Sequence, residues 1–268
     1  MKHGQKILKR RIFKIFSYMG IRIAKTRDEQ SLVNFLRELH PLKFDLIRLG
    51  GNGDGGYLIP DDLENITICF SPGVSNIMDF ELDLAERGIS SFMADFTVSP
   101  KSVSNPNFHF IQKFVGPMDS DQEINFQSWI LSNSKEDQDL ILQMDIEGAE
   151  YATIMSCDQS VLRRFRIMVI EFHGLDLLLD EQAHSQIEIC FKKILQDFQV
   201  VHIHPNNNDP SRFLRTTEVP SLMEFTFIRK DRVKDIEHQT KFPHPLDRPT
   251  VSNVADIKLP TSWFRGEK

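Results

Sequence analysis

From residue 66 onward, short runs of apolar and β-branched residues alternate with stretches in which apolar residues recur at helical spacing. Strands that alternate with helices predict a mostly parallel sheet covered on both faces, which is a doubly wound α/β fold of the Rossmann-like type. The expected strands lie at 66–70, 91–95, 108–114, 140–145, 167–172, 200–204 and 223–228, and the expected helices at 77–87, 122–132, 148–163 and 181–198.

The chain before residue 66 has a different pattern. Residues 1–27 hold nine of the 32 Lys and Arg residues and no acid, and their apolar residues have helical spacing. Such a segment is typical either of an amphipathic helix on anionic lipid or of a helix that packs on its own domain. A second helix is expected at 31–40, and a hairpin around the glycine-rich loop 50–56. We therefore divide the chain into a basic helical segment, 1–43, and a main domain, 44–268.

Charge and cysteine content exclude several classes of protein. Beyond residue 27 the chain has 23 basic residues against 38 acidic ones, and such a body repels a phosphate backbone, so we expect no nucleic-acid partner. Cys69, Cys157 and Cys190 form no C-x-x-C pair, which argues against both a disulfide framework and a zinc site. No apolar run approaches the ~20 residues that span a bilayer, and no signal-peptide cleavage site follows the basic start. The expected location is cytoplasmic, with residues 1–27 as a peripheral contact to the inner face of the membrane.

Polar residues gather at the carboxyl ends of the predicted strands, where an open α/β sheet binds its ligands. The bodies of the same strands are apolar, so the pattern marks the strand ends in particular. The residues at these ends are Gly73, Asp95, Asp145, Glu147, Glu171, His173 and the run from His202 to Asn208.

The turn at Gly73 bears on the cofactor. A dinucleotide enzyme uses several glycines, in the pattern G-x-G-x-x-G, to bring its backbone against a pyrophosphate. Here Ser75 stands where the second glycine is expected, and S-adenosylmethionine, which carries no phosphate, needs only one close approach. Asp95 ends the next strand, where a carboxylate accepts hydrogen bonds from both ribose hydroxyls. We therefore predict S-adenosylmethionine as the cofactor in preference to NAD.

The stretch 140–151, LILQMDIEGAEY, is the most distinctive in the chain. A hydrophobic strand leads directly into Asp145 and Glu147, and Gly148 then lets the backbone turn into a helix. The two carboxylates suit the ammonium group of the cofactor, a divalent metal or the acceptor. Glu150 lies in the first helical turn, where a negative charge is favourable to the helix dipole.

Residues 142–150, LQMDIEGAE, resemble the L-K-x-D-x-E-G-x-E signature of the FkbM-type class I S-adenosylmethionine-dependent methyltransferases. Gln143 stands in place of the usual lysine. The resemblance extends over about residues 44–264, and a bacterial, often glycan-associated subgroup of the family is similar at 48–51, 54–57, 70–74, 171–173 and 202–207.

The resemblance implies a class I methyltransferase fold, a mostly parallel seven-stranded sheet with an antiparallel last strand. It also implies that an adenosine lies between Gly73 and Asp95 and that its sulfonium faces Asp145 and Glu147. Ser71 is a departure, because many class I methyltransferases have an acid two residues before the first glycine. The cofactor-binding residues that we predict are Ser71, Gly73, Asp95, Asp145 and Glu147.

Methyl transfer to an oxygen also requires the removal of the acceptor's proton. His173 and His204 each lie just past a strand end and titrate near neutrality, so they are the candidate bases, and Asp145 and Glu171 are the neighbouring catalytic carboxylates. His202 points to the same face as His204 but lies deeper in the strand. The alternative is a divalent metal that lowers the pKa of the hydroxyl, held by Asp145, Glu171, His173, His204 and Asn206.

Two loops flank the predicted site. The loop 50–56 either folds over the ligand, with Arg48 and Tyr57 as contacts, or is a tight turn. The polar segment 206–220 is expected to be a long loop, and its asparagine amides suit the hydroxyls of a sugar as well as ordinary turns. We therefore predict O-methylation of a sugar, a glycan or another hydroxylated small molecule, as in polysaccharide assembly.

Two other functions fit parts of the pattern. Asp145-Ile146-Glu147 mimics the D-x-D metal motif of metal-dependent glycosyltransferases. A non-catalytic Rossmann module that supports a polysaccharide complex through its basic segment is the second alternative. A methyltransferase acting on nucleic-acid bases is not expected, because no Asn/Asp-Pro-Pro-Tyr/Phe sequence follows the fourth strand of the predicted sheet.

Overall fold

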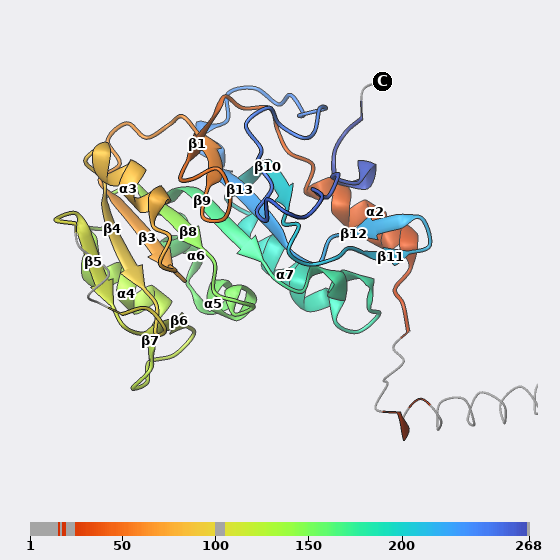
Figure 1. Ribbon diagram of the computed structural model, residues 1–268, viewed down its shortest axis with the longest axis horizontal. Coiled ribbons are helices and arrows are strands. Elements are labelled where there is room, and N and C mark those ends of the chain that lie inside the picture. Colours follow the sequence, from red (N-terminus) through yellow and green to blue (C-terminus); the bar gives the residue numbers. More distant parts are fainter. Residues whose placement is uncertain (1–15, 17, 20–24, 100–104, 267–268) are drawn as a thin grey trace, which may run out of the picture.

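The computed structural model describes residues 16, 18–19, 25–99 and 105–266, and its centre is a seven-stranded sheet (Figure 1). The last strand in sequence runs antiparallel to both of its neighbours, and the other strand pairs of the sheet are parallel. This arrangement confirms the predicted class I methyltransferase fold. In spatial order the strands are β10 (Phe198–Pro205), β13 (Met223–Arg229), β9 (Phe165–Phe172), β8 (Leu140–Met144), β3 (Ile68–Pro72), β4 (Ser90–Ala94) and β5 (Phe108–Ile111).

The order of the strands reverses beside β3. From β3 the chain moves outward to β4 and β5, and it then returns to β8 on the other side of β3. Adjacent parallel strands whose connections leave in opposite directions open a crevice at their carboxyl ends, and ligands of doubly wound proteins bind there. The fold therefore places its crevice between Gly73, after β3, and Asp145, after β8.

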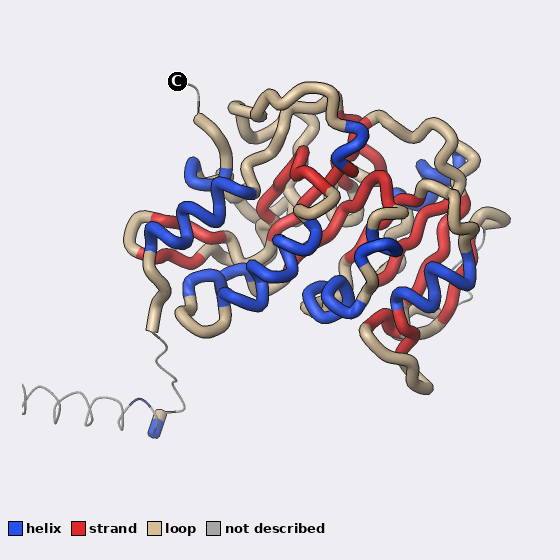
Figure 2. The backbone as a smooth tube through the Cα atoms, turned by 180° about the vertical axis from the view of Figure 1, so that it is seen from behind, coloured by secondary structure: helices blue, strands red, loops and turns tan. Residues whose placement is uncertain are grey.

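Helices and a hairpin cover the two faces of the sheet (Figures 1 and 2). On one face the larger core cluster packs helices against the strands, and on the other face a second cluster packs a hairpin and one helix. The first cover consists of α2 (Glu29–Glu38), α4 (Phe126–Asn133), α5 (Glu150–Ser156), α6 (Gln159–Leu162) and α7 (His184–Ile194), and the second of β1 (Leu46–Leu49), β2 (Tyr57–Pro60) and α3 (Asp79–Glu86).

Alternation along β8 shows how a strand serves both faces. Leu140, Leu142 and Met144 belong to the larger cluster, and Ile141 belongs to the second. Successive side chains of a strand point to opposite faces, so Gln143 and then Asp145 follow Ile141 onto the hairpin side. The polar ends of the strands thus open beneath the β1–β2 hairpin and α3.

Three segments differ from the prediction in their local structure. The segment 108–114 is interrupted after Ile111, and its end forms β6 (Phe114–Gly116), which pairs with β7 (Glu123–Asn125) outside the main sheet. The helix expected at 148–163 is split, because Asp158 has the extended backbone of a helix start. The loop expected at 206–220 contains a hairpin, β11 (Arg212–Leu214) and β12 (Thr217–Val219).

Helix α2 packs into the larger core through Leu32, Phe35 and Leu36. Its first residue, Glu29, accepts hydrogen bonds from Thr216 and Thr217, which explains why α2 lies beside the β11–β12 hairpin in Figure 1. The described residues before 44 thus share the core of the main domain. The division of the chain at residue 43 stays a prediction.

Most of the basic segment 1–27, and most of its predicted helix, lies outside the described residues. At the described end of this segment, Arg27 is 5% exposed and pairs with Glu188 at 2.5 Å. Arg27 is therefore buried and not available to a lipid surface, which corrects the prediction at this position. No described helix is long and apolar enough to cross a membrane.

The described chain beyond β13 has little regular structure. It contains two short 3-10 helices, η3 (Lys230–Arg232) and η4 (Thr261–Trp263). Trp263 is fully buried in the larger core, and its indole Nε1 donates to the carbonyl of Glu218 at 3.0 Å. The C-terminal segment is therefore packed on the domain as a structural part.

Candidate active site

A cavity of about 580 Å³ opens at the carboxyl ends of β3, β4 and β8. Predicted cofactor residues from all three strand ends lie in its wall. The wall of this cavity includes Asp54, Tyr57, Gly73, Glu81, Asp95, Phe114, Val115, Pro117, Gln143, Asp145 and Glu147. Gly73, Asp95, Asp145 and Glu147 are thus brought together, and their role in cofactor binding stays a prediction.

Gly73 has a φ of +88°, in the left-handed region that glycine favours. A Cβ atom at this position would lie 1.5 Å from the backbone oxygen of Asp145. The backbone nitrogen of Asp145 donates to the carbonyl of Pro72 at 3.1 Å, so the ends of β3 and β8 are in direct contact. The close approach of two strand ends requires a glycine here.

Asp95 lies at the end of β4, on the side of the cavity that has apolar walls. Its Oδ1 accepts hydrogen bonds from the backbone nitrogen and the hydroxyl of Thr97, both at 2.6 Å. Phe114, Val115 and Pro117 line the same cavity. A carboxylate held next to apolar side chains suits the ribose and the base of an adenosine.

Ser71 does not line the cavity, which corrects its place among the predicted cofactor contacts. It is fully buried, and its hydroxyl is hydrogen-bonded to the carboxylate of Glu81 and lies 2.6 Å from Oε1 of Gln143. Glu81 and Gln143 themselves line the cavity. Glu81 was missed in the sequence, because a glutamate on an expected helix gives no signal of burial.

A second cavity, of about 400 Å³, lies next to the first and opens at the ends of β8, β9 and β10. Asp54, Asp145 and Glu147 line both cavities. A group bound in one cavity therefore faces a group bound in the other across these three carboxylates. The remaining wall of the second cavity is mostly polar and is formed by Glu171, His173, Gly174, Asn206, Asn208, Asp209, Ser221, Leu222, Thr250 and Val251.

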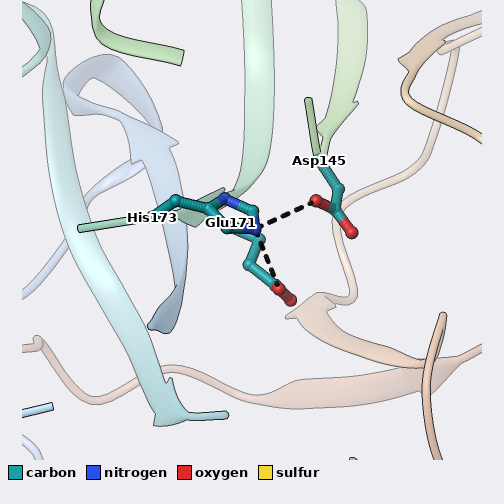
Figure 3. Close-up of side chains that lie close together, drawn as sticks. All are labelled: Asp145, Glu171 and His173. Atoms are coloured by element: carbon teal, nitrogen blue, oxygen red, sulfur yellow. Dashed lines mark ion pairs between the residues drawn. The ribbon is translucent and has the colours of Figure 1, made fainter. Parts of the chain in front are cut away.

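His173 is the centre of the cluster at this junction (Figure 3). Its Nε2 lies 3.3 Å from Oε2 of Glu147 and 3.9 Å from both Asp145 and Glu171. The predicted residues Asp145, Glu171 and His173 thus come together, with ligand atoms within 4.8 Å of one another. Two carboxylates and an imidazole are a donor set that fits a divalent transition metal.

Glu150 orients the imidazole of His173. This glutamate is fully buried, and its Oε1 lies 3.1 Å from Nδ1 of His173. The same oxygen accepts from the backbone nitrogens of Ile146, at 3.2 Å, and Gly148, at 3.0 Å. A hydrogen on Nδ1 that is donated to Glu150 leaves the lone pair on Nε2, which faces the junction. Glu150, a position of the signature, therefore does more than interact with the helix dipole, as its place in the first helical turn had indicated.

Burial and the charges of the cluster shift the pKa values of its members. Burial raises the pKa of Asp145 to about 7, and it raises the pKa of Glu171 well above its ordinary value. Burial alone would lower the pKa of His173, but the hydrogen bond to Glu150 and the nearby carboxylates raise it overall. The junction therefore attracts positive charge.

His204 does not reach either cavity, which corrects its place among the candidate bases and metal ligands. It is 4% exposed and lies with His202 against Asp247 of the C-terminal segment. The distances to the carboxylate of Asp247 are 2.9 Å from Nε2 of His202 and 3.7 Å from Nδ1 of His204. Burial lowers the pKa of His204, but pairing with Asp247 outweighs it and raises the pKa to about 9.

The glycine-rich loop 50–56 is held by Arg48 from below. The guanidinium donates to the carbonyls of Gly51, at 2.8 Å, and Gly53, at 3.2 Å, and it lies outside the wall of both cavities. Tyr57 does line the first cavity, as predicted for a ligand contact. Asp54, at the tip of the loop, lines both cavities and was not singled out in the sequence.

The asparagine run after β10 has mainly structural partners. Asn206 donates to Glu171 at 3.2 Å, and the amide of Asn207 bonds the backbone of Val251 and Val254. Asn207 thereby fastens the C-terminal segment against the second cavity. Of the three amides, those of Asn206 and Asn208 lie in the cavity wall.

Comparison with known proteins identifies the domain. The model of the methyltransferase FkbM domain matches residues 95–193, which include β8, the carboxylates after it and His173. Residues 95–193 of the chain are thus similar to the FkbM methyltransferase domain. The resemblance noted in the sequence is thereby confirmed, and with it the assignment to the S-adenosylmethionine-dependent methyltransferases. No curated protein matches the chain in sequence.

Solved structures similar to the chain have low sequence identity. One is a Listeria monocytogenes protein described as an S-adenosylmethionine-dependent methyltransferase, with 8% identity and a TM-score of 0.37 over 62% of this chain and 91% of that one. Another is the fibrillarin/Nop5p complex, also with 8% identity and a TM-score of 0.37, over 62% of this chain and 73% of that one. With such TM-scores and identities, these structures carry no argument about the site of this chain.

Proposed function

We propose that this FkbM protein transfers the methyl group of S-adenosylmethionine to a hydroxyl oxygen of a sugar, a glycan or another hydroxylated small molecule. The observation that carries the proposal is the junction of the two cavities, where carboxylates meet the orientated imidazole of His173. The cofactor would lie in the first cavity and the acceptor in the second. The polar wall of the second cavity suits hydroxyl groups, and its carboxylates disfavour a phosphate backbone as the acceptor.

Methyl transfer to a hydroxyl requires that these residues position the two reactants and accept the hydroxyl proton. The methyl group leaves the sulfonium as the acceptor oxygen attacks in line, so the protein must hold both groups in position. The hydroxyl proton passes to Nε2 of His173, whose Nδ1 is held by Glu150. The cofactor leaves as S-adenosylhomocysteine, and the methyl ether is the second product.

A divalent metal at Asp145, Glu171 and His173 is the alternative way to activate the hydroxyl. When bound, such an ion would lower the pKa of the hydroxyl and orient it. The two routes differ in their response to a chelator. Turnover that survives EDTA supports His173 as the base, and turnover that is lost and returns with Mn²⁺ or Mg²⁺ supports the metal.

The proposal is tested first by binding and then by turnover. Calorimetry is expected to detect S-adenosylmethionine and S-adenosylhomocysteine, but not NAD or nucleotide sugars. A methyl-labelled cofactor is then offered with a panel of sugars and other hydroxylated acceptors. Binding of a nucleotide sugar alone would indicate a glycosyltransferase, and cofactor binding with no transfer to any acceptor would indicate a non-catalytic module.

The role of His173 is tested with His173→Asn. Loss of a general base is expected to lower kcat by about 10²–10⁴-fold with little change in cofactor affinity. His109→Asn, on β5 and exposed, is the matched control and should keep full activity. If His173→Asn turns over at the rate of the unaltered protein, another group removes the proton.

The pH profile gives an independent test of the same role. A base must be neutral to accept a proton, and the pKa of His173 is raised above 6.5, so kcat/KM should fall as the pH is lowered through a midpoint above that value. Because Glu150 contributes to that increase, Glu150→Gln should move the midpoint to lower pH. An unchanged midpoint in this variant would contradict the assignment of the profile to His173.

A further inference from the structure

Glu81 is a buried acid in the wall of the cofactor cavity. It lies in the first turn of α3, is 3% exposed, and faces the cavity while its neighbours Phe80 and Leu84 pack into the second core cluster. The charge of a glutamate at this depth has a high desolvation cost unless a partner compensates it. The position of Glu81 therefore needs an explanation.

The described neighbours of Glu81 supply hydrogen bonds but no positive charge. Its Oε1 is bonded by the hydroxyl of Ser71, which in turn contacts the amide of Gln143. That amide donates to the hydroxyl of Tyr57 at 3.3 Å. Burial raises the pKa of Glu81 and the hydrogen bond from Ser71 lowers it, while the charge of Asp79, a described neighbour, raises it further. The described surroundings of Glu81 thus hold its carboxyl group in place and offer it no counter-charge.

A carboxylate of this kind is suited to a cationic group of the ligand. S-adenosylmethionine has two positive groups, the sulfonium and the α-ammonium. The sulfonium has to face the second cavity, because its methyl group must reach the acceptor, and Asp54, Asp145 and Glu147 form that junction. Glu81 lines the first cavity only, over β3, so the α-ammonium is the cation left for it.

We propose that Glu81 binds the α-ammonium group of the cofactor, with Ser71 as the positioning residue that orients its carboxylate. The inference rests on the proposed use of S-adenosylmethionine. It also accounts for Ser71, which stands where many class I methyltransferases have an acid. Here the carboxylate reaches the end of β3 from helix α3 instead of from the strand itself.

The test compares ligands that have or lack the amino-acid arm. Calorimetry with S-adenosylhomocysteine is compared with methylthioadenosine, which keeps the adenosine and lacks the ammonium. Glu81→Gln is expected to lower the affinity for S-adenosylhomocysteine by about 10- to 100-fold, the usual effect of losing a hydrogen bond to a charged group. The affinity for methylthioadenosine should stay within about twofold, which also shows that the variant is folded. Glu86→Gln, exposed on the same helix, removes the same charge and should change neither affinity.

Several outcomes would overturn the inference. Equal weakening of both ligands by Glu81→Gln, or no weakening of either, excludes a contact with the ammonium. A larger loss for S-adenosylmethionine than for S-adenosylhomocysteine would assign Glu81 to the sulfonium instead. If the unaltered protein binds neither of these two ligands, the proposed function fails before the inference is reached.

A measurement on the unaltered protein covers the case in which Glu81→Gln does not fold. S-adenosylhomocysteine is compared with its desamino analogue, and the inference expects the analogue to bind at least about 10-fold more weakly. Equal affinities would overturn it. The double variant Ser71→Asp, Glu81→Gln returns a carboxylate to the strand, and recovered S-adenosylhomocysteine affinity would support the exchange of positions.

Discussion

Single residues at the strand ends determine whether the crevice exists at all. At Gly73 the absence of a side chain lets β3 and β8 meet, and the left-handed backbone turns the chain towards α3. At Asp145 burial raises the pKa to about 7, and the carboxyl lies 3.9 Å from Nε2 of His173. The chemistry of the site thus depends on conformational freedom at one position and on desolvation at the other.

Gly73→Ala tests the first of these effects. An added Cβ would lie 1.5 Å from the oxygen of Asp145, so the strand ends must separate, and we expect a loss on the order of 3 kcal/mol or more of unfolding free energy. Cofactor affinity should fall at least about 10-fold, because the crevice itself changes shape.

Gly88→Ala is the matched control for this variant. Its φ is +76°, but nothing lies within 4 Å of the added atom, so only the left-handed strain of about 1–2 kcal/mol is expected. Urea denaturation and calorimetry of both variants make the comparison. Similar losses of stability in the two would show that the contact with Asp145 is relaxed at little cost.

At the scale of elements, a network of charged side chains joins the strands at the end of the sheet opposite the two cavities. No sequence pattern indicated this network. Arg166 of β9 is 6% exposed, lies 2.7 Å from Asp139, and donates to the carbonyls of Asp62 and Glu64. Arg229 of β13 reaches the same Asp139 at 2.6 Å. This network ties β8, β9, β13 and the loop after β2 together at the amino-terminal ends of the parallel strands.

Arg166→Ala is expected to lower the unfolding free energy by roughly 3 kcal/mol, because a partly buried pair loses one partner and leaves the carboxylates and carbonyls unsatisfied. Cofactor affinity should stay unchanged, since the network lies away from both cavities. Lys43→Ala, which removes an exposed pair with Glu237, should cost less than about 1 kcal/mol. Chemical denaturation measures both, and equal costs would mean that burial adds nothing to the network.

At the scale of the whole molecule, the C-terminal segment closes the second cavity and is fastened to the sheet at several points. Thr250 and Val251 line that cavity, Asn207 holds the backbone beside them, and Asp247 meets the two histidines of β10. The segment after β13 and the asparagine run after β10 therefore form part of the wall of the second cavity together.

The pairing of Asp247 predicts how stability depends on pH. The pKa of His204 is raised to about 9 from an ordinary 6.5, so its contribution to stability is complete below 6.5 and is lost as the pH rises through 9. Burial raises the pKa of Asp247, but the two histidines lower it overall, so its contribution is present above its ordinary value and is lost in acid.

Thermal unfolding should therefore show a fall in Tm between about pH 6.5 and pH 9 that is reduced in Asp247→Asn. Hydrogen exchange of the segment 247–254 is expected to increase in that variant at neutral pH, because its link to β10 is weakened. If the Tm of Asp247→Asn changes with pH in the same way as that of the unaltered protein, the pairing of Asp247 with the histidines does not cause the pH dependence.

The sequence alone determined the fold class and the family resemblance, because both depend on local patterns. Hydrophobic periodicity predicts the strands and helices. The carboxyl ends of parallel strands lie on the same side of the sheet, whatever the order of the strands. Gly73, Asp95, Asp145, Glu147, Glu171 and His173 were therefore predicted to lie close together, and the structure places them around two joined cavities. The three cysteines are buried and are not paired with one another.

Only the tertiary structure decided which polar side chains face those cavities. Glu81 reaches the crevice from a helix face, although its position does not differ in the sequence from an ordinary helical glutamate. Glu150 is a signature position, but its contact with His173 is visible only in the fold. His204 has the expected place at a strand end, yet Asp247, from a segment without periodicity, pairs with it and leaves it buried. Contacts between residues distant in the chain depend on packing, and periodicity carries no information about which charged partner arrives from elsewhere.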